Sequence, residues 1–240
     1  MDDIIEKGEI NAEMTEATLL SAMPELSTEQ RWQFINYYNM LIERNRFVNL
    51  TRITSPEDVA RKHFADSVMA AALIPEGAKV VDVGTGAGFP GVPLAIVRPD
   101  ISLTLIDSLG KRVRFLEEVC AAIGVKARCI HARAEDAARD DGLRAHFDIA
   151  LSRAVAPVNV LLELTVPFLK VGGRSLMYKA GDVAEELAAG ANAMKELCCE
   201  AEVFEMPADW GARTVVAAKK LAKTSSRYPR KAGTAQKKPL

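Results

Sequence analysis

The sequence predicts an α/β protein in which a mostly parallel, seven-stranded sheet carries helices on both faces and follows a set of N-terminal helices. Three observations predict it. Short apolar runs typical of buried strands alternate with helical patterns from Lys79 onward, and such alternation favours a parallel sheet. A glycine-rich turn at residues 84–88 follows the first of these runs. The first 75 residues carry helix starts and helical periodicity instead.

Length and composition allow one large α/β domain with an added helical piece, or two small domains. The chain has 240 residues and is 49% hydrophobic, so it can bury a sizeable core and is not disordered as a whole. We expect an N-terminal helical segment over residues 1–75, the α/β domain over residues 76–220 and a basic C-terminal tail over residues 221–240.

Composition also disfavours several classes of protein. The longest uninterrupted apolar run, residues 68–74, is far too short to span a bilayer. The N-terminus is acidic where a secretory signal would be basic. The four cysteines show no CxxC spacing and only three histidines are present, so we expect neither a metal site nor a disulfide framework. We therefore expect a cytoplasmic protein without a membrane partner, and a monomer.

Two helix starts are predicted in the N-terminal segment. Ser27 and Gln30 have the spacing of a capping box, and apolar side chains follow at helical spacing. A second helix begins at Ser55-Pro56, with proline at its first position and acids in its first turn. We expect this second helix to run to Leu73.

Strand and helix patterns alternate through the α/β domain. The expected strands are residues 79–83, 102–107, 125–131, 147–152, 174–179, 202–206 and 213–218. The expected helices include residues 93–97, 111–123, 158–169 and 182–198. The last two strands are close enough in sequence to form a hairpin.

The glycine-rich turn lies where a buried strand passes into a helix, which is where doubly wound sheets bind ligands. Gly84, Gly86 and Gly88 permit positive φ and a close approach of ligand to backbone. A dinucleotide fingerprint, G-x-G-x-x-G, would need a glycine at Phe89. The G-x-G-x-G spacing is instead typical of methyltransferases. The Asp82 carboxylate either faces the amino group of a methionine moiety or accepts hydrogen bonds from the loop.

Two further segments follow strands at positions suited to a nucleotide. Asp107 ends the second strand, where it either binds ribose hydroxyls or caps the following helix. Ala134 and Glu135 follow the third strand, where one backbone amide and one carboxylate can hold an adenine ring. An acidic loop is the alternative interpretation of that segment.

Charge is distributed unevenly along the chain. Residues 1–30 carry eight acidic side chains and one base, whereas residues 214–240 carry eight Lys or Arg and no acid. A basic tail that contains Pro229 and Pro239 either follows a phosphate backbone or is a disordered, solvated end.

Several motifs, taken in order, resemble one family: the bacterial 16S ribosomal RNA guanine-N7 methyltransferases, known as ribosomal small-subunit methyltransferase G or glucose-inhibited division protein B. The motifs are Asn49-Leu50-Thr51, His63-Phe64-Ala65-Asp66-Ser67, Asp82 to Gly91, Arg98-Pro99, Asp107 to Arg112, Ser152-Arg153-Ala154 and the tail from Pro229 to Leu240. The resemblance covers about residues 45–240. The sequence departs from the family at Ala232, where proline is more usual.

The resemblance implies a class I S-adenosylmethionine-dependent methyltransferase fold, which is Rossmann-like, with N-terminal helices packed against it. It implies methyl transfer from S-adenosylmethionine to N7 of a guanine in the 16S rRNA of the 30S subunit. By position in the motifs it implies cofactor contacts from Gly84, Phe89, Ala134, Glu135 and Arg153. Spacing alone adds Asp82, Gly86, Gly88 and Asp107 to that set.

Guanine N7 carries an unprotonated lone pair at neutral pH, so its methylation needs alignment of the reactants rather than a general base. We therefore expect no catalytic acid or base. Arg153, at the end of the fourth strand, either positions the substrate or forms a surface salt bridge. His63 and Asp66 lie three residues apart on one helical face and are expected to hold the helical segment on the sheet.

Other basic residues have two interpretations each. Lys179 either meets a phosphate or is exposed, and Lys111, Arg112 and Arg114 either form a rim for RNA or are solvated helix charges. The rival functions are a methyltransferase acting on another RNA, a small molecule or a protein, a nicotinamide-dependent oxidoreductase, and a non-enzymatic RNA-binding module. Phe89 argues against the oxidoreductase, and the intact glycine turn argues against the non-enzymatic module.

Overall fold

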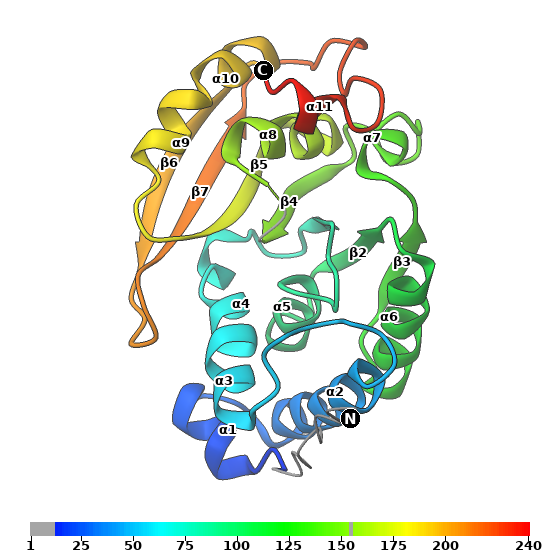
Figure 1. Cartoon of the computed structure of the whole chain (residues 1–240), viewed down its shortest axis with the longest axis vertical. Helices are drawn as coiled ribbons and strands as arrows, with labels where there is room; N and C mark the ends of the chain where they lie inside the picture. Colours follow the sequence, from blue (N-terminus) through cyan, green and yellow to red (C-terminus); the bar gives the residue numbers. More distant parts are fainter. Residues whose placement is uncertain (1–12, 154–155) are drawn as a thin grey trace, which may run out of the picture.

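Seven strands form one sheet in the computed structural model, which describes residues 13–153 and 156–240 (Figure 1). The strands are β1 (Lys79–Val83), β2 (Ser102–Asp107), β3 (Ala127–His131), β4 (Phe147–Arg153), β5 (Leu169–Ala180), β6 (Cys199–Met206) and β7 (Arg213–Lys220). Their order across the sheet is β3-β2-β1-β4-β5-β7-β6. Pairing is parallel from β3 to β5, whereas β7 pairs antiparallel with both β5 and β6. The predicted sheet and the predicted final hairpin are confirmed.

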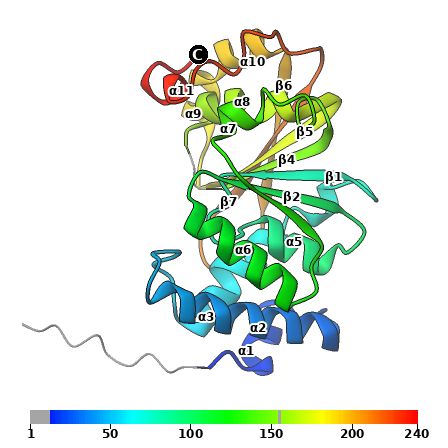
Figure 2. The same ribbon diagram turned by 90° about the vertical axis from the view of Figure 1, so that its right-hand side faces the viewer.

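Helices cover both faces of this sheet (Figure 2). One layer contains α1 (Glu16–Ala22), α2 (Thr28–Asn45), α3 (Pro56–Val59), α5 (Gly91–Val97) and α6 (Gly110–Ala122). The other contains α7 (Ala134–Ala137), α8 (Val158–Thr165), α9 (Ala184–Ala189), α10 (Ala191–Leu197) and α11 (Thr234–Lys237). Within the described part of the chain, no helix is long and apolar enough to cross a membrane.

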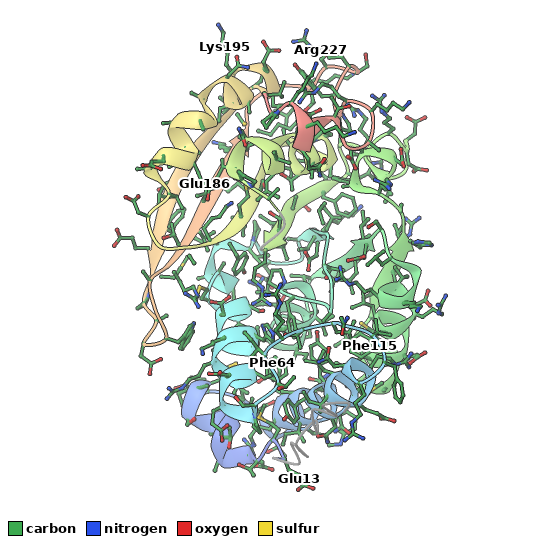
Figure 3. All side chains as sticks on the ribbon, viewed as in Figure 1. Glu13, Phe64, Phe115, Glu186, Lys195 and Arg227 are labelled. Atoms are coloured by element: carbon green, nitrogen blue, oxygen red, sulfur yellow. The ribbon has the colours of Figure 1, made fainter. Side chains whose placement is uncertain are left out.

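The N-terminal helices share a buried core with the sheet. The predicted capping box at Ser27 and Gln30 is present at the start of α2. Phe34 of α2 packs against Phe64, with ring centroids 4.8 Å apart, and both belong to the same buried cluster as Val80 of β1. Phe64 is labelled in Figure 3. The helices are therefore packed on the sheet, as the family resemblance implies. Residues 1–12 of the predicted segment, and Ala154 of one motif, lie outside the described residues.

The second N-terminal helix differs from its prediction, and its extension to Leu73 is wrong. After α3 the chain forms a π-helix over Ala60–Ala65 and one turn of α4 over Asp66–Val68, and a 3₁₀ turn covers Ala71–Leu73. The Ser67 carbonyl accepts a 2.8 Å hydrogen bond from the Tyr178 hydroxyl of β5. The Ser67 carbonyl, which lies where the helix ends, thus has a hydrogen-bond partner outside the helix.

Two boundaries in the second half of the chain also differ. β5 begins at Leu169, five residues before the start of the predicted strand over residues 174–179. The predicted helix over residues 158–169 is shorter: α8 ends at Thr165 and is followed by a short 3₁₀ turn that contains Pro167. Proline has no amide hydrogen to continue an α-helix. The predicted helix over residues 182–198 is divided into α9 and α10 at Gly190, a residue type that destabilises a helix interior.

The C-terminal tail is packed against the protein, so its interpretation as a solvated end is wrong. Arg230 forms an ion pair with Glu163, a carboxylate on α8 that is only 1% exposed. Arg144 donates hydrogen bonds to the carbonyls of Thr224 and Tyr228. A buried carboxylate is costly without a cation, and the tail supplies one from 67 residues away in sequence. Figure 1 shows the resulting position of α11 beside α8 and α7.

Gly88→Ala should destabilise the protein, because the glycine turn packs closely against Tyr37 of α2 at Gly88. A Cβ at this glycine would lie 2.6 Å from the Tyr37 hydroxyl and 2.9 Å from Val92, and its φ is +105°. We expect a loss of about 3 kcal/mol in the free energy of unfolding, measured by urea denaturation, from overpacking added to left-handed strain.

The matched control is Gly172→Ala, where φ is +89° and nothing lies within 4 Å of the added Cβ. Its loss should be about 1 kcal/mol, since only the backbone strain remains. Equal losses in the two variants would contradict the packing role of Gly88.

Candidate active site

A cavity of about 640 Å³ opens at the carboxyl ends of β1, β2 and β4. Its wall is formed by the glycine turn, the start of α7, the loop after α2, the π-helix and the C-terminal tail. The volume is that of a site for a small molecule or cofactor. Seven of the nine predicted cofactor residues line it, namely Gly84, Gly86, Phe89, Asp107, Ala134, Glu135 and Arg153.

The glycine turn presents its backbone to this cavity. Gly84, Gly86 and Gly88 all have positive φ, which L-residues with side chains rarely adopt. A Cβ on Gly86 would meet nothing within 4 Å, so this glycine leaves space open on the cavity side. Gly88 faces the other way, against Tyr37 and Leu116, and is not part of the cavity wall.

Asp82 lies behind the turn and is not part of the cavity wall either. Its Oδ2 accepts hydrogen bonds from the Thr85 hydroxyl at 2.8 Å and the Gly91 amide at 2.9 Å. Its Oδ1 is buried and has no hydrogen-bond partner within the described structure. Burial raises the pKa of the Asp82 carboxyl to about 6, despite these two hydrogen bonds, which lower it. The side chain therefore supports the loop through one oxygen and leaves the other unpaired.

Asp107 connects the second strand to the glycine turn. Its Oδ2 accepts a hydrogen bond from the Gly86 amide, and its Oδ1 accepts one from the Leu109 amide, both at 2.9 Å. The Arg112 guanidinium lies 3.5 Å from Oδ2. Because each carboxylate oxygen has two lone pairs, these bonds leave acceptor capacity for a ligand in the cavity.

Glu135 lies on the opposite wall, at the start of α7. Its carboxylate is buried, and Oε1 accepts a 2.8 Å hydrogen bond from the Gly233 amide of the tail. The residues of the tail that line the cavity are Gly233, Gln236 and Lys237. The acidic segment that follows β3 is thus part of the cavity wall rather than an isolated loop.

An aromatic and cationic cluster forms the remaining wall. The Phe89 ring stacks on the His63 ring with centroids 4.4 Å apart, and the Arg153 guanidinium lies 4.9 Å above Phe89. Arg153 also bonds to Asp66 at 3.0 Å and to Nδ1 of His63 at 3.2 Å. Nε2 of His63 lies 2.7 Å from the Thr51 hydroxyl. Arg153 is therefore held in one orientation by three neighbours.

The geometry requires a neutral His63. Because a guanidinium can only donate, Nδ1 must act as the acceptor, and Nε2 then carries the proton toward Thr51. Burial, followed by the charge of Arg153, lowers the pKa of His63 to about 3. The histidine therefore acts here as a fixed acceptor for Arg153 rather than as a proton carrier at neutral pH.

The prediction that His63 and Asp66 hold the helical segment on the sheet is confirmed. Both side chains bond to Arg153 at the end of β4. Asp66 also accepts a 2.5 Å hydrogen bond from Arg213 of β7. With 13% of its side chain exposed, Arg153 forms a largely buried ion pair rather than the surface salt bridge that was the alternative.

The interpretation of Lys179 as an exposed lysine is wrong. Its ammonium group is largely buried and donates to the Ala156 carbonyl and to Glu186 of α9, which is labelled in Figure 3. On α6, Arg112 lines the cavity, whereas Lys111 and Arg114 are exposed.

Sequence reasoning did not single out several residues of the cavity wall. They are Leu50, Thr51, Gly233, Gln236 and Lys237. The signal available was the family resemblance, because both Asn49-Leu50-Thr51 and the tail belong to its motifs. Spacing could not assign them a role, since they approach the cavity only through tertiary contacts.

The low pKa of His63 predicts a pH effect on stability. In the folded protein the pKa of His63 lies below its ordinary value of 6.5. Between pH 6.5 and about 3, His63 is therefore protonated in the unfolded chain and neutral in the folded protein. This group therefore lowers stability as the pH falls through that window. Asp82 acts in the opposite sense: its folded pKa is raised, so folded protein gains stability as the pH falls from about 6 to 3.8.

His63→Gln should separate these two effects. The variant lacks the contribution of the histidine and keeps those of Asp82 and the other carboxylates, so it should gain about 2 kcal/mol relative to wild type between pH 6.5 and 4.5. Urea denaturation at several pH values measures this difference. A difference between variant and wild type that stays constant with pH would show that His63 is not held neutral.

The comparisons with known proteins agree with this geometry. A family model described as rRNA small subunit methyltransferase G matches residues 30–209. A protein named ribosomal RNA small subunit methyltransferase G from Lactobacillus delbrueckii subsp. bulgaricus is 41% identical over 239 residues, covering 96% of this chain and 100% of that protein. A protein of the same name from Desulfitobacterium hafniense is 44% identical over 220 residues, covering 90% and 92%.

Solved structures support the fold. A putative O-methyltransferase from Klebsiella pneumoniae aligns with a TM-score of 0.55 and 14% identity, covering 88% of this chain and 97% of that one. A SAM-dependent O-methyltransferase from Thermotoga maritima aligns with a TM-score of 0.52 and 17% identity, covering 77% and 73%. The predicted class I methyltransferase fold is confirmed. The family model and the two relatives match most of the length of this chain. The chain therefore belongs to the rRNA small subunit methyltransferase G family.

Proposed function

We propose that this protein transfers a methyl group from S-adenosylmethionine to N7 of a specific guanine in the 16S rRNA of the small ribosomal subunit. One observation carries the proposal. A cavity of cofactor size lies at the carboxyl ends of the strands, between the glycine turn and Glu135, in a chain of this family. The relatives bear the name of small-subunit rRNA methyltransferases.

The residues of the cavity fit the proposed cofactor. Asp107 offers carboxylate lone pairs to ribose hydroxyls, and Ala134 with Glu135 offers a backbone segment and a carboxylate to an adenine edge. Asp82 lies behind the glycine turn and would act on the cofactor through the loop, which its Oδ2 holds by hydrogen bonds from Thr85 and Gly91. When bound, S-adenosylmethionine supplies an electrophilic methyl group on a sulfonium.

The protein's own residues would contribute orientation rather than proton transfer. Guanine N7 has no proton to remove, so the chain needs no general base. Arg153, held over Phe89 by Asp66 and neutral His63, is the residue that we propose positions the base beside the cofactor. A fixed guanidinium donates hydrogen bonds in a planar fork that suits guanine or phosphate oxygens.

The charges at the cavity support a polyanionic substrate. Arg112, Arg133 and Lys237 line the cavity and the last two are exposed, whereas the carboxylates of Asp107 and Glu135 in the same wall are buried. Exposed cations can contact RNA phosphates while the buried carboxylates face the cofactor.

The test is to incubate the protein with methyl-labelled S-adenosylmethionine and unmodified 30S subunits, free 16S rRNA or tRNA. We expect label in 16S rRNA, recovered after digestion as N7-methylguanosine at one position. Label in tRNA alone, or on an atom other than guanine N7, would overturn the proposal. Methylation of a small molecule in place of RNA would favour the rival methyltransferase function.

A further inference from the structure

The C-terminal tail contributes Gly233, Gln236 and Lys237 to the cavity wall. We propose that residues 230–238 form the adenosine-side wall of the cofactor site, and that docking of this segment and cofactor binding strengthen each other through Glu135. The inference rests on the proposed function, because it takes S-adenosylmethionine as the ligand. It adds a positioning element outside the sheet and its loops.

The segment is anchored by a buried ion pair. The Arg230 guanidinium donates to both oxygens of Glu163 at 2.6–3.0 Å, and the Arg230 amide donates to Oε1 at 2.7 Å. Glu163 lies in the last turn of α8 and is almost completely buried. Undocking would leave this carboxylate without its cation, so the anchor strongly favours the docked tail.

Beyond the anchor, the chain turns toward the cavity. Gly233 has φ of +78° and donates its amide to Oε1 of Glu135, and α11 follows directly. Ala235 of α11 packs in a buried cluster with Leu164 of α8, and Gln236 and Lys237 line the cavity. Figures 1 and 2 both show α11 lying beside α7 and α8.

Glu135 is the link between the two events. One of its carboxylate oxygens is engaged by the tail, while the residue itself faces the cavity. A docked tail therefore holds the carboxylate in one orientation before the ligand arrives, and less conformational entropy is lost when the ligand binds. By linkage, a ligand that contacts Glu135 in this orientation stabilises the docked tail by the same factor.

Two variants and a control test the first direction, the effect of the docked tail on cofactor binding, by calorimetric titration with S-adenosylmethionine. Removing residues 231–240 deletes the wall but keeps Arg230 on Glu163, and should raise Kd about tenfold or more. Gly233→Ala strains the turn that presents the amide to Glu135, and should raise Kd several-fold, by roughly 3 to 5 times.

The matched control is Gly77→Ala. Gly77 also has positive φ, open space around an added Cβ and an amide that donates to a carboxylate, that of Asp100. It lies outside the cavity wall. This variant should lose melting temperature like Gly233→Ala and yet bind the cofactor with the wild-type Kd.

Hydrogen exchange of the intact chain tests the reverse direction and does not depend on whether a truncated chain folds. Saturating S-adenosylmethionine should slow amide exchange in residues 230–238 about tenfold, matching the loss of affinity on truncation. The edge strand β6 serves as the internal reference, because it does not line the cavity.

The outcomes separate the two proposals. Absence of any cofactor binding by the wild-type protein overturns the proposed function and this inference together. Normal binding by the wild type, with the same Kd in the 231–240 deletion and in Gly233→Ala, overturns the inference alone. Exchange in residues 230–238 that the cofactor leaves unchanged has the same consequence.

Discussion

Gly86→Val should abolish useful binding of S-adenosylmethionine, raising Kd by about 100-fold or more. Gly86 lies in the cavity wall, and an added Cβ would meet no protein atom within 4 Å. The valine side chain would therefore project into the space that the ligand needs. The same residue donates its amide to Asp107, so a displaced backbone would also move the proposed ribose acceptor. Calorimetric titration measures the change in Kd.

Backbone strain must be separated from this steric effect, because Gly86 has φ of +62°. Gly124→Val is the control: its φ is +71°, nothing lies within 4 Å of the added Cβ, and the residue follows α6 away from the cavity. Both variants should lose about 1–2 kcal/mol of stability from left-handed strain. Only Gly86→Val should lose the cofactor; comparable Kd values in the two variants would contradict the assignment of the cavity.

The sheet and the glycine turn could be predicted from the sequence because their signals are local. A parallel strand covered on both faces is a continuous apolar run, as in Val80-Val81 of β1, and a turn with positive φ calls for glycine. The carboxyl ends of such strands meet at one edge of the sheet, so Asp107 and Glu135 could be assigned to one cavity from chain order. The assignment of Arg153 to that cavity came from the family resemblance.

The docking of the tail and the partners of Lys179 could not be predicted, because those contacts depend on how separate elements pack together. Nothing near Arg230 in the sequence indicates that Glu163 lies in a buried position on α8. Likewise, Lys179 was expected at a phosphate or in solvent, yet Glu186 and a carbonyl of the β4–α8 connection receive its hydrogen bonds. Charge patterns locate ionisable side chains along the chain, but pairing depends on the packing of elements that are separate in sequence.

Asp66→Ala should destabilise the protein by about 3–5 kcal/mol, the usual effect of removing one partner of a buried ion pair while the other stays buried. Asp66 is 5% exposed and lies between two guanidinium groups, 3.0 Å from Arg153 and 2.5 Å from Arg213. Without it, two cations face each other in a poorly solvated place. Asp58→Ala is the control, because its ion pair with Lys62 is exposed and should contribute no more than about 1 kcal/mol. Urea denaturation measures both losses.

A second substitution separates two effects of Asp66→Ala: the lost attraction between Asp66 and the guanidinium groups, and the new repulsion between Arg153 and Arg213. In Asp66→Ala/Arg213→Met, the guanidinium of β7 is gone and only Arg153 remains, still bonded to His63. The double variant should therefore recover about 1–2 kcal/mol of the stability lost by Asp66→Ala, a favourable coupling within the range found for neighbouring charges. Methyl transfer should stay low in both variants, because Arg153 has lost the carboxylate that orients it over Phe89. A double variant less stable than Asp66→Ala would mean that Arg213 stabilises the cluster through its packing, and that charge balance around Arg153 is not what Asp66 provides.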